Sequence, residues 1–239
     1  MKKSMIVFMT LSVLVVAMVC IALAQDFDAS MKADKAIKCR QFAELEDVAI
    51  ILEVNETDLD AEIVLAINSD DGIRRLSVWD PRKRRVLDLK TRDRGRIGLS
   101  EVIIETAEPD IESVLNAYPE GEYAILVKTV FGDRLMGTAE LRHDLLPAPS
   151  FSPSKGDLVD PDADLVVTWD PVPEAKSYTI EIEQDDLDVN ITTKLDGTAT
   201  TFRVPAGFLV PGTEYEIGIA TEAPNGNLSV AEGTFQTIE

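Results

Sequence analysis

Residues 209–221 read LVPGTEYEIGIAT, and this stretch decides the fold of the second half of the chain. Pro211 and Gly212 mark a tight turn, because proline presets its first corner and glycine accepts the positive φ of its second. The residues after the turn alternate in type, with Tyr215 and two isoleucines on one side and acidic or small residues on the other. A period of two predicts a strand with one buried face.

The same alternation recurs on both sides of this stretch. LVVTWDPVP at 165–173 alternates into Trp169 and stops at prolines, and SYTIEIEQ at 177–184 places Tyr178 and two isoleucines on one face. TTFRVP at 200–205 and NLSVAEGTFQT at 227–237 are further short strand candidates. Several short strands separated by turn residues predict an all-β sandwich.

These residues resemble the fibronectin type III family over residues 146–239. The resemblance rests on Trp169 in the second strand, Tyr178 in the third, and the corner Leu-x-Pro-Gly-Thr-x-Tyr from Leu209 to Tyr215. It implies a core built on these four side chains, and a Tyr215 hydroxyl that bonds to nearby backbone and locks the corner. It further implies strands near 164–170, 176–184, 188–196, 199–204, 213–221 and 227–237.

In some members of that family the loop between the last two strands serves cell adhesion. Here this loop, residues 223–227, reads APNGN and carries no Arg-Gly-Asp tripeptide, so integrin-type adhesion has no support. Asn227 also begins one of three matches to the N-glycosylation pattern, which we interpret as chance matches if the source is bacterial. The three matches begin at Asn55, Asn190 and Asn227.

The first half, residues 46–145, predicts a second sandwich. DVAIILEV and EIVLAI are apolar runs of strand length, and IRRLSVWD and RVLDLK are two further strands joined across the tight turn PRKR. GLSEVIIETA is another strand candidate, Asp110 is the N-cap of one short helix, and Gly132-Asp133 closes a last hairpin. This half loosely resembles a bacterial immunoglobulin-like module, and the prolines of Leu145–Pro149 predict the domain junction.

The N-terminus predicts an export signal. Lys2 and Lys3 precede an apolar run, residues 5–24, that ends in Ala-Leu-Ala, a small-residue cleavage pattern. We therefore expect a signal peptide at 1–24, a leader at 25–45 and a secreted or periplasmic protein. The alternative is an uncleaved membrane anchor, because residues 5–24 are long enough to span a bilayer. Without the signal only Cys39 remains, either as a free thiol or paired with another molecule.

Charge and composition exclude several classes of function. The chain has 23 Lys and Arg against 43 Asp and Glu, and such a surface repels nucleic acid. His143 is the single histidine, so neither a nucleophile–histidine pair in a recognisable motif nor a zinc site is predicted. We predict no enzyme; two carboxylates suffice for a glycosidase, so an enzyme with a carboxylate-based site in the first domain stays an alternative.

Acidic loops could supply oxygen ligands for calcium. The best candidate is GDLVDPDAD, which contains Asp157, Asp160, Asp162 and Asp164. No acidic loop follows the spaced twelve-residue pattern with its central glycine and terminal glutamate. We therefore predict no cofactor, with a structural calcium ion as the alternative.

Basic residues gather in one stretch of this acidic chain. Between Arg74 and Arg96 lie ten Lys and Arg against three Asp. If strands 73–80 and 85–91 form a hairpin, its tip and the flanking loop would form one cationic end that docks an anionic partner. The alternative is compensation by acids of the neighbouring domain. The partner-binding candidates are Arg82, Lys83, Arg84, Arg85, Arg92, Arg94 and Arg96.

Together these features predict an exported, non-enzymatic binding or spacer protein of the cell envelope or its exterior. Its partner would be a protein or an anionic polysaccharide, with membrane contact only through an uncleaved signal. A carbohydrate-binding accessory module is the other alternative, in which Trp79 would be exposed as a sugar platform rather than fill the core.

Overall fold

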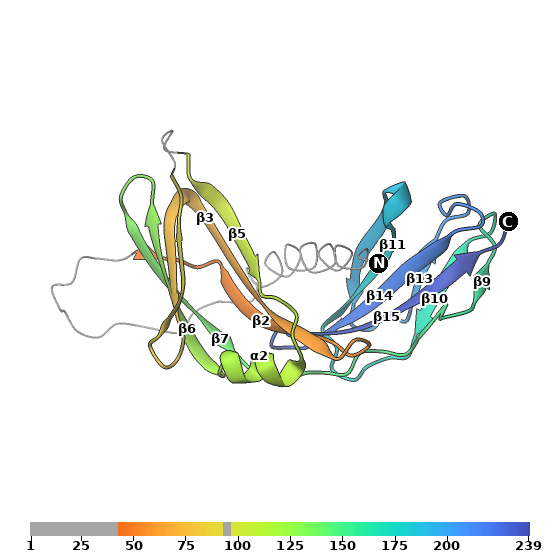
Figure 1. The fold of residues 1–239 in the computed structure, drawn as a ribbon, viewed down its shortest axis with the longest axis horizontal. Helices are drawn as coiled ribbons and strands as arrows, with labels where there is room; N and C mark the ends of the chain where they lie inside the picture. Colours follow the sequence, from red (N-terminus) through yellow and green to blue (C-terminus); the bar gives the residue numbers. More distant parts are fainter. Residues whose placement is uncertain (1–42, 93–96) are drawn as a thin grey trace.

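The computed structural model describes residues 43–92 and 97–239, and the chain in these ranges is built mainly of β-strands (Figure 1). The predicted signal peptide, most of the leader, Cys39, Arg94 and Arg96 lie outside the described residues. No helix within the described ranges is long and apolar enough to cross a membrane. The end of the predicted leader differs from expectation, because Ala43–Glu44 form strand β1, which pairs in parallel with β7 (Arg134–Leu141).

The first half, residues 43–145, is organised around one long strand, β3 (Asp60–Trp79). The amino-terminal part of β3 lies between β2 and β5, and its carboxy-terminal part lies between β4 and β6. A short helix, α2, follows β5, and Asp110 caps it by accepting a hydrogen bond from the Ser113 amide, as predicted. The elements are β2 (Val48–Asn55), β4 (Arg85–Lys90), β5 (Leu99–Glu105), α2 (Ile111–Ala117) and β6 (Gly121–Thr129).

The prediction of two separate strands, EIVLAI and IRRLSVWD, was wrong, because both belong to β3. The polar residues between them do not form a turn; the pairing shifts register between Asn68 and Ile73. Gly72 has a φ of 70°, and a Cβ there would approach the Ile97 carbonyl oxygen to 2.4 Å. The strand therefore bends through an irregularity that requires glycine, and one strand serves both parts of the sheet.

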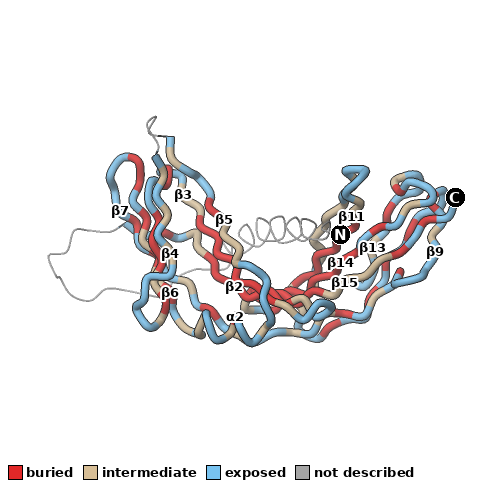
Figure 2. Tube along the Cα trace, in the orientation of Figure 1, coloured by how far each residue is buried: buried red, intermediate tan, exposed pale blue. Residues whose placement is uncertain are grey.

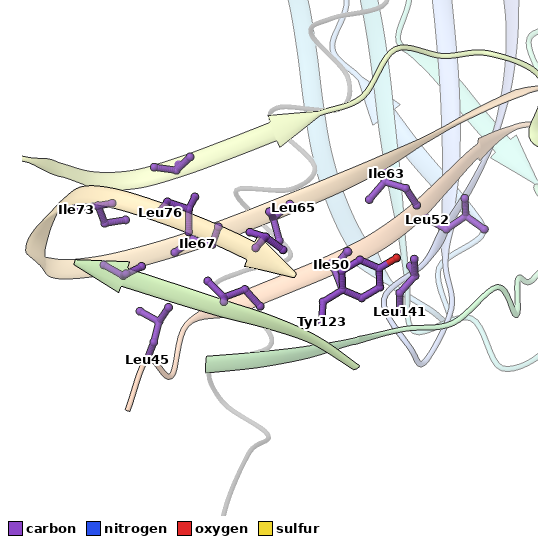
Figure 3. Packing of buried hydrophobic residues seen from close by; sticks show 14 of the residues in the cluster. Leu45, Ile50, Leu52, Ile63, Leu65, Ile67, Ile73, Leu76, Tyr123 and Leu141 are labelled. Atoms are coloured by element: carbon purple, nitrogen blue, oxygen red, sulfur yellow. The ribbon is translucent and has the colours of Figure 1, made fainter. Parts of the chain in front are cut away.

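Side chains from β2, β3, β6 and β7 form most of the hydrophobic core of this half (Figure 3). Val114 of α2 joins this core. Alternate residues of β2, such as Ile50 and Leu52, point into this core together with Ile63 and Leu65 of β3. The intervening residues of β2 are also buried, on the opposite face of the sheet. β2 is thus covered on both faces, which its nearly continuous apolar sequence favours.

The second half, residues 146–239, is a sandwich of two sheets. One sheet has the order β13-β10-β8, and the other carries β12, β11, β14 and β15, with β9 added to β15. A one-turn 3-10 helix, Asp185–Leu187, joins β11 to β12. The strands are β8 (Phe151–Ser152), β9 (Leu158–Val159), β10 (Leu165–Trp169), β11 (Ser177–Gln184), β12 (Val189–Asp196), β13 (Thr201–Val204), β14 (Glu214–Glu222) and β15 (Leu228–Thr237).

The two halves share one sheet, because β15 of the second half pairs in parallel with β2 of the first. Figure 1 shows the halves as two arms that meet where β2 lies beside β15. The buried residues in Figure 2 continue through this meeting point. A third hydrophobic cluster bridges it, with Ala49 and Ile51 from the first half and Leu228 and Val230 from the second. We call this region, with the loop at residues 223–227, the joint.

Candidate functional site

The basic residues predicted to bind a partner do not act as one group. Arg84 is committed to Asp80, whose carboxylate accepts hydrogen bonds from the Arg84 amide and Nε, both at 2.7 Å. Burial would raise the pKa of Asp80, but the hydrogen bonds from Arg84 outweigh it and the pKa falls below its ordinary value. Arg82 and Lys83 remain exposed at the β3–β4 turn, with no ion pair within the described residues.

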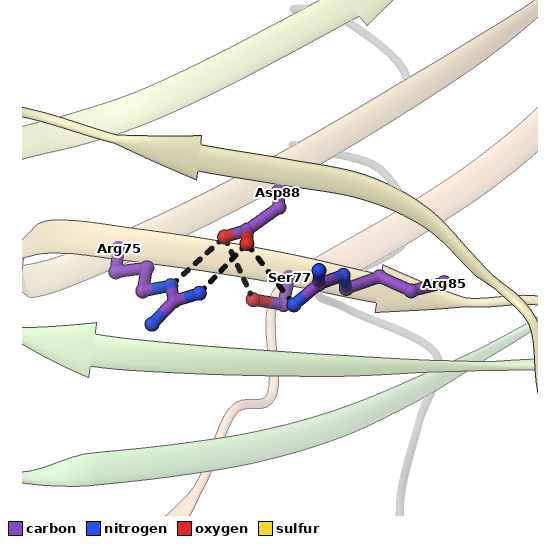
Figure 4. A network of polar contacts seen from close by, with 4 residues as sticks. All are labelled: Arg75, Ser77, Arg85 and Asp88. Carbon is purple, nitrogen blue, oxygen red and sulfur yellow. Dashed lines mark hydrogen bonds and ion pairs between the residues drawn. The ribbon is translucent and has the colours of Figure 1, made fainter.

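A second carboxylate in the same hairpin holds two further arginines (Figure 4). Asp88 accepts hydrogen bonds from Arg75 Nε at 2.8 Å and from Ser77 Oγ at 3.3 Å, and Arg85 Nη1 lies 3.1 Å from it. The Arg75 hydrogen bonds lower the pKa of Asp88 to about 2. Within the described residues, the basic stretch forms its ion pairs with acids of its own hairpin.

Among the described residues, the exposed cations Arg82 and Lys83 lie apart from Arg92. The six residues of β4 separate the turn at 80–84 from Arg92, and a six-residue strand is about 20 Å long. Thr91 lies beside Arg74, whose carbonyl accepts its amide hydrogen bond, at the end of the hairpin opposite the turn. The sequence placed these cations close along the chain, but an antiparallel hairpin separates its turn from its open end. We call Arg82 and Lys83 the basic turn.

The other candidates of the sequence analysis are engaged in local structure. Trp79 is only partly buried at the end of β3. The His143 amide donates to Glu120 Oε1 at 2.8 Å, and its Nε2 lies 2.9 Å from the Tyr118 carbonyl oxygen.

In the loop proposed for calcium, Asp157, Asp160 and Asp164 accept backbone hydrogen bonds from Ser154, Asp162 and Ala206. Among the residues described, no three His, Cys, Asp or Glu side chains are placed to hold a metal ion.

The four predicted core residues of the second half lie together between its two sheets. Trp169, Tyr178, Leu209 and Tyr215 belong to one buried cluster. The rings of Trp169 and Tyr178 are 5.5 Å apart, and the Val172 amide donates a 2.7 Å hydrogen bond to the Tyr178 hydroxyl. The Val210 amide donates to the Tyr215 hydroxyl at 2.8 Å, which is the corner expected from the sequence. The second half has a fibronectin type III-like fold.

The loop between β14 and β15 holds the joint. Asn227, which is 2% exposed, accepts a hydrogen bond from the Leu52 amide at 3.0 Å through its Oδ1. Its Nδ2 donates to the carbonyl oxygens of Arg142 at 2.8 Å and Asp144 at 2.9 Å. One side chain thus ties the second half to β2 and to the connecting segment. Its burial also leaves no room for a glycan at this sequence match.

Backbone and side-chain contacts extend this attachment along β15. The Glu56 amide donates to the Val230 carbonyl at 2.9 Å, and Asn55 Nδ2 donates to Glu232 Oε2, also at 2.9 Å. A Cβ on Gly226 would lie 3.4 Å from Ile51, so the loop packs closely on the first half. The loop between β14 and β15 is therefore a structural contact between the two halves.

Carboxyl groups crowd beside the joint. A hollow of about 220 Å³ is lined by the turn at Thr57–Asp58 and by β11, β14 and β15. Half of its ten lining residues are acidic and none is basic: Asp58, Glu181, Glu183, Glu216 and Glu232. Burial is the largest cause that raises the pKa of Glu232, to about 7, despite the hydrogen bond from Asn55 that lowers it.

A buried ion cluster lies on the same sheet of the second half. Glu222, 1% exposed, contacts Lys194 Nζ at 2.6 Å and Lys176 Nζ at 3.1 Å, and accepts a hydrogen bond from Ser177. Burial would raise the pKa of Glu222, but Lys194, Ser177 and Lys176 together hold it below its ordinary value. This carboxylate is therefore charged and paired with two lysines.

Sequence reasoning did not identify the joint. Asn227 had only the glycosylation pattern to mark it, and Glu53 and Glu232 stood among 43 acidic residues. One sequence feature did point there: the runs DVAIILEV and EIVLAI are too continuously apolar for strands with one wet face. They indicate a second covering surface, but not which segment provides it.

Comparison with known proteins gives structural similarities only. No protein-family model matches the chain, and no curated protein matches it. A two-domain fibronectin type III segment of chicken tenascin is 14% identical, with a TM-score of 0.30 over 80% of this chain and 97% of that segment. The FN1–FN3 domains of chicken CNTN1 are 11% identical (TM-score 0.32; 79% of this chain and 64% of that one). A bacterial ice-binding adhesin is 12% identical (TM-score 0.30; 84% and 67%).

Proposed function

We propose that the protein is an exported, non-enzymatic binding and spacer protein of the cell envelope or its exterior. The observation that carries the spacer role is the pairing of β2 with β15, which continues one sheet from the first half into the second. Two sandwiches joined only by a flexible linker would reorient freely. Strand pairing, the shared hydrophobic cluster and the Asn227 hydrogen bonds together favour one stiff arm.

A distance measurement tests the stiffness directly. Spin labels at cysteines replacing Thr138 and Asp186, in a Cys20→Ser, Cys39→Ser background, report the separation of the two halves. We expect one narrow distance distribution, as narrow as that of a control pair at Lys155 and Asp186 within the second half. A distribution much broader than the control would show that the halves move independently and would refute the spacer role.

The binding role is assigned to the basic turn. Arg82 and Lys83 are exposed, and the two acids of their hairpin are already engaged by Arg75, Arg84 and Arg85. Two unneutralised cations on a strongly acidic chain form a local site for an anionic partner, either acidic polysaccharide or an acidic protein surface.

Retention on an acidic polysaccharide matrix tests this assignment. We expect Arg82→Glu with Lys83→Glu to elute at clearly lower salt than the wild-type protein. The matched control, Arg134→Glu with Lys155→Glu, makes the same change in net charge far from the turn. Equal elution of the two variants would show that only net charge matters and would remove the basic turn as the site.

The enzyme alternative placed a carboxylate-based site in the first half, whereas the carboxyl groups that gather around a hollow lie mainly on β11, β14 and β15 of the second half. The hollow combines several carboxyl groups with Glu232, whose raised pKa would suit a general acid. Its volume of about 220 Å³ is below the roughly 300 Å³ at which small-molecule pockets begin. We therefore favour binding; release of reducing sugar from a polysaccharide panel, abolished by Glu232→Gln, would overturn that choice.

A further inference from the structure

Three acidic side chains lie side by side on adjacent strands next to the joint. Glu53 of β2 is the direct cross-strand partner of Glu62 of β3. Glu105 of β5 is paired with Val64, two residues from Glu62, so Glu105 is a diagonal neighbour of Glu62 on the same face of the sheet. Cross-strand partners have Cβ atoms about 5 Å apart, and like charges at that distance destabilise a sheet. The arrangement is therefore unfavourable when all three carboxyl groups are ionised.

Burial increases this penalty. Glu53 is 8% exposed and Glu62 is 4% exposed. Within the described residues, Oε2 of Glu53 and Oε1 of Glu105 have no hydrogen-bond partner. A buried carboxylate oxygen without a donor loses its hydration without compensation. A protonated carboxyl group has an O–H that can donate a hydrogen bond to a neighbouring carboxylate oxygen. Proton uptake by one of these acids would therefore both remove a negative charge and supply a hydrogen-bond donor.

Further acids extend from these three side chains across the joint. Glu53 faces Glu62, Glu105 and Glu108 of the first half and Glu232 of the second. Glu232 in turn faces Asp58 and Asp60 of the β2–β3 turn and Glu216 of β14. Glu222 lies on the same face of the sheet, opposite Leu228, which in turn pairs with Glu53. It holds the two cations of that region, Lys176 and Lys194. Among the described residues, the strongest charge interactions of Glu53 and Glu232 are with other acids.

We propose that the joint is a pH-sensitive contact, in which Glu53 and Glu232 take up protons when β2 and β15 are paired and weaken that pairing when they ionise. Both residues lie on the two strands that form the joint, and Glu232 reaches Asn55 across it. This inference rests on the joint and not on the identity of any binding partner.

The direction of the effect follows from linkage. The pKa of Glu53 is raised well above its ordinary value by burial and then by Glu62, and that of Glu232 is raised to about 7. A group whose pKa is raised in the joined state stabilises that state fully below its ordinary pKa of about 4.5, and this stabilisation is lost as the pH rises through 7. The joint should therefore be tighter in mildly acidic conditions and looser at neutral to alkaline pH.

Hydrogen exchange of the full-length chain in mild detergent tests the proposal. The Leu52 and Glu56 amides bond to Asn227 and Val230 across the joint, so their protection reports its opening. After correction for intrinsic exchange, Glu232 alone predicts roughly 25- to 30-fold more opening at pH 8 than at pH 5.5. Amides inside β6, which lie away from the joint, serve as the internal reference and should change little.

Neutral variants separate this effect from general loss of stability. Glu53→Gln with Glu232→Gln resembles the protonated joint, and should keep high protection at both pH values. Glu122→Gln, at an exposed position of β6, should behave like the wild-type protein. Joint amides of the wild-type protein that show no pH dependence beyond that of β6 would overturn the proposal. The proposal would also be overturned if the double variant kept the pH dependence of the wild-type joint amides. If the double variant does not fold, the pH dependence of the wild-type joint amides by itself tests the proposal.

Discussion

Replacement of Asn227 by alanine should uncouple the two halves of the protein. The substitution removes three side-chain hydrogen bonds, one from the Leu52 amide and two to the carbonyl oxygens of Arg142 and Asp144. Leu52 is fully buried, so its amide would lose its partner with no access to water. Each lost bond is worth about 1 kcal/mol, and an unsatisfied buried amide costs about 1–3 kcal/mol. The expected loss is therefore about 3 kcal/mol, concentrated at the joint.

Urea unfolding followed by tryptophan fluorescence measures this loss half by half. Trp79 lies in the first half and Trp169 in the second, so Trp79→Phe and Trp169→Phe backgrounds each report one half. We expect the two transitions to coincide in the parent protein and to separate after Asn227→Ala. With a slope of about 2–3 kcal/mol/M, the less stable half should move by about 1 M urea.

Asn116→Ala is the matched control, because it removes an exposed amide from α2 and should change stability by less than about 0.5 kcal/mol. The reasoning would be refuted if Asn227→Ala unfolded like this control, with coincident transitions at unchanged urea concentrations. The joint would then owe its strength to the hydrophobic cluster and to strand pairing alone.

Three further predictions concern single side chains. Tyr215→Phe should lower the free energy of unfolding by about 1–2 kcal/mol, because the Val210 amide loses its acceptor, whereas Tyr118→Phe should change it little; equal urea midpoints would contradict this. Glu222→Gln should destabilise the second half by about 2 kcal/mol in the same assay, because Lys176 and Lys194 lose their buried counter-charge, and an unchanged Trp169 transition would argue against it. Asp88→Asn should release Arg75 and Arg85 and delay elution from the acidic polysaccharide matrix more than Asp162→Asn does; identical elution would show that the released arginines do not bind.

Local patterns were sufficient to predict most strands and the corner of the second half. Alternation at 177–184 and 213–221 places Tyr178 and Tyr215 inside, because successive side chains of a strand point to opposite faces. The Asp110 cap and the Gly132 hairpin were likewise predictable, since both depend on neighbours a few residues away. The continuity of β3 could not be predicted in this way. The polar stretch in its middle could form either a turn or a bend within one strand, and the pairing with β5 and β6 decides between them.

The sequence alone therefore determined that residues 146–239 form a sandwich with Trp169, Tyr178 and Tyr215 in its core. It also determined that the chain is strongly acidic, with its cations gathered in one stretch. Only the tertiary structure decided that β15 pairs with β2, that Asn227 closes the joint, and that Glu53 and Glu232 meet across it. The physical reason is separation along the chain: Leu52 and Asn227 are 175 positions apart, and no local periodicity in the sequence predicts a contact at that distance.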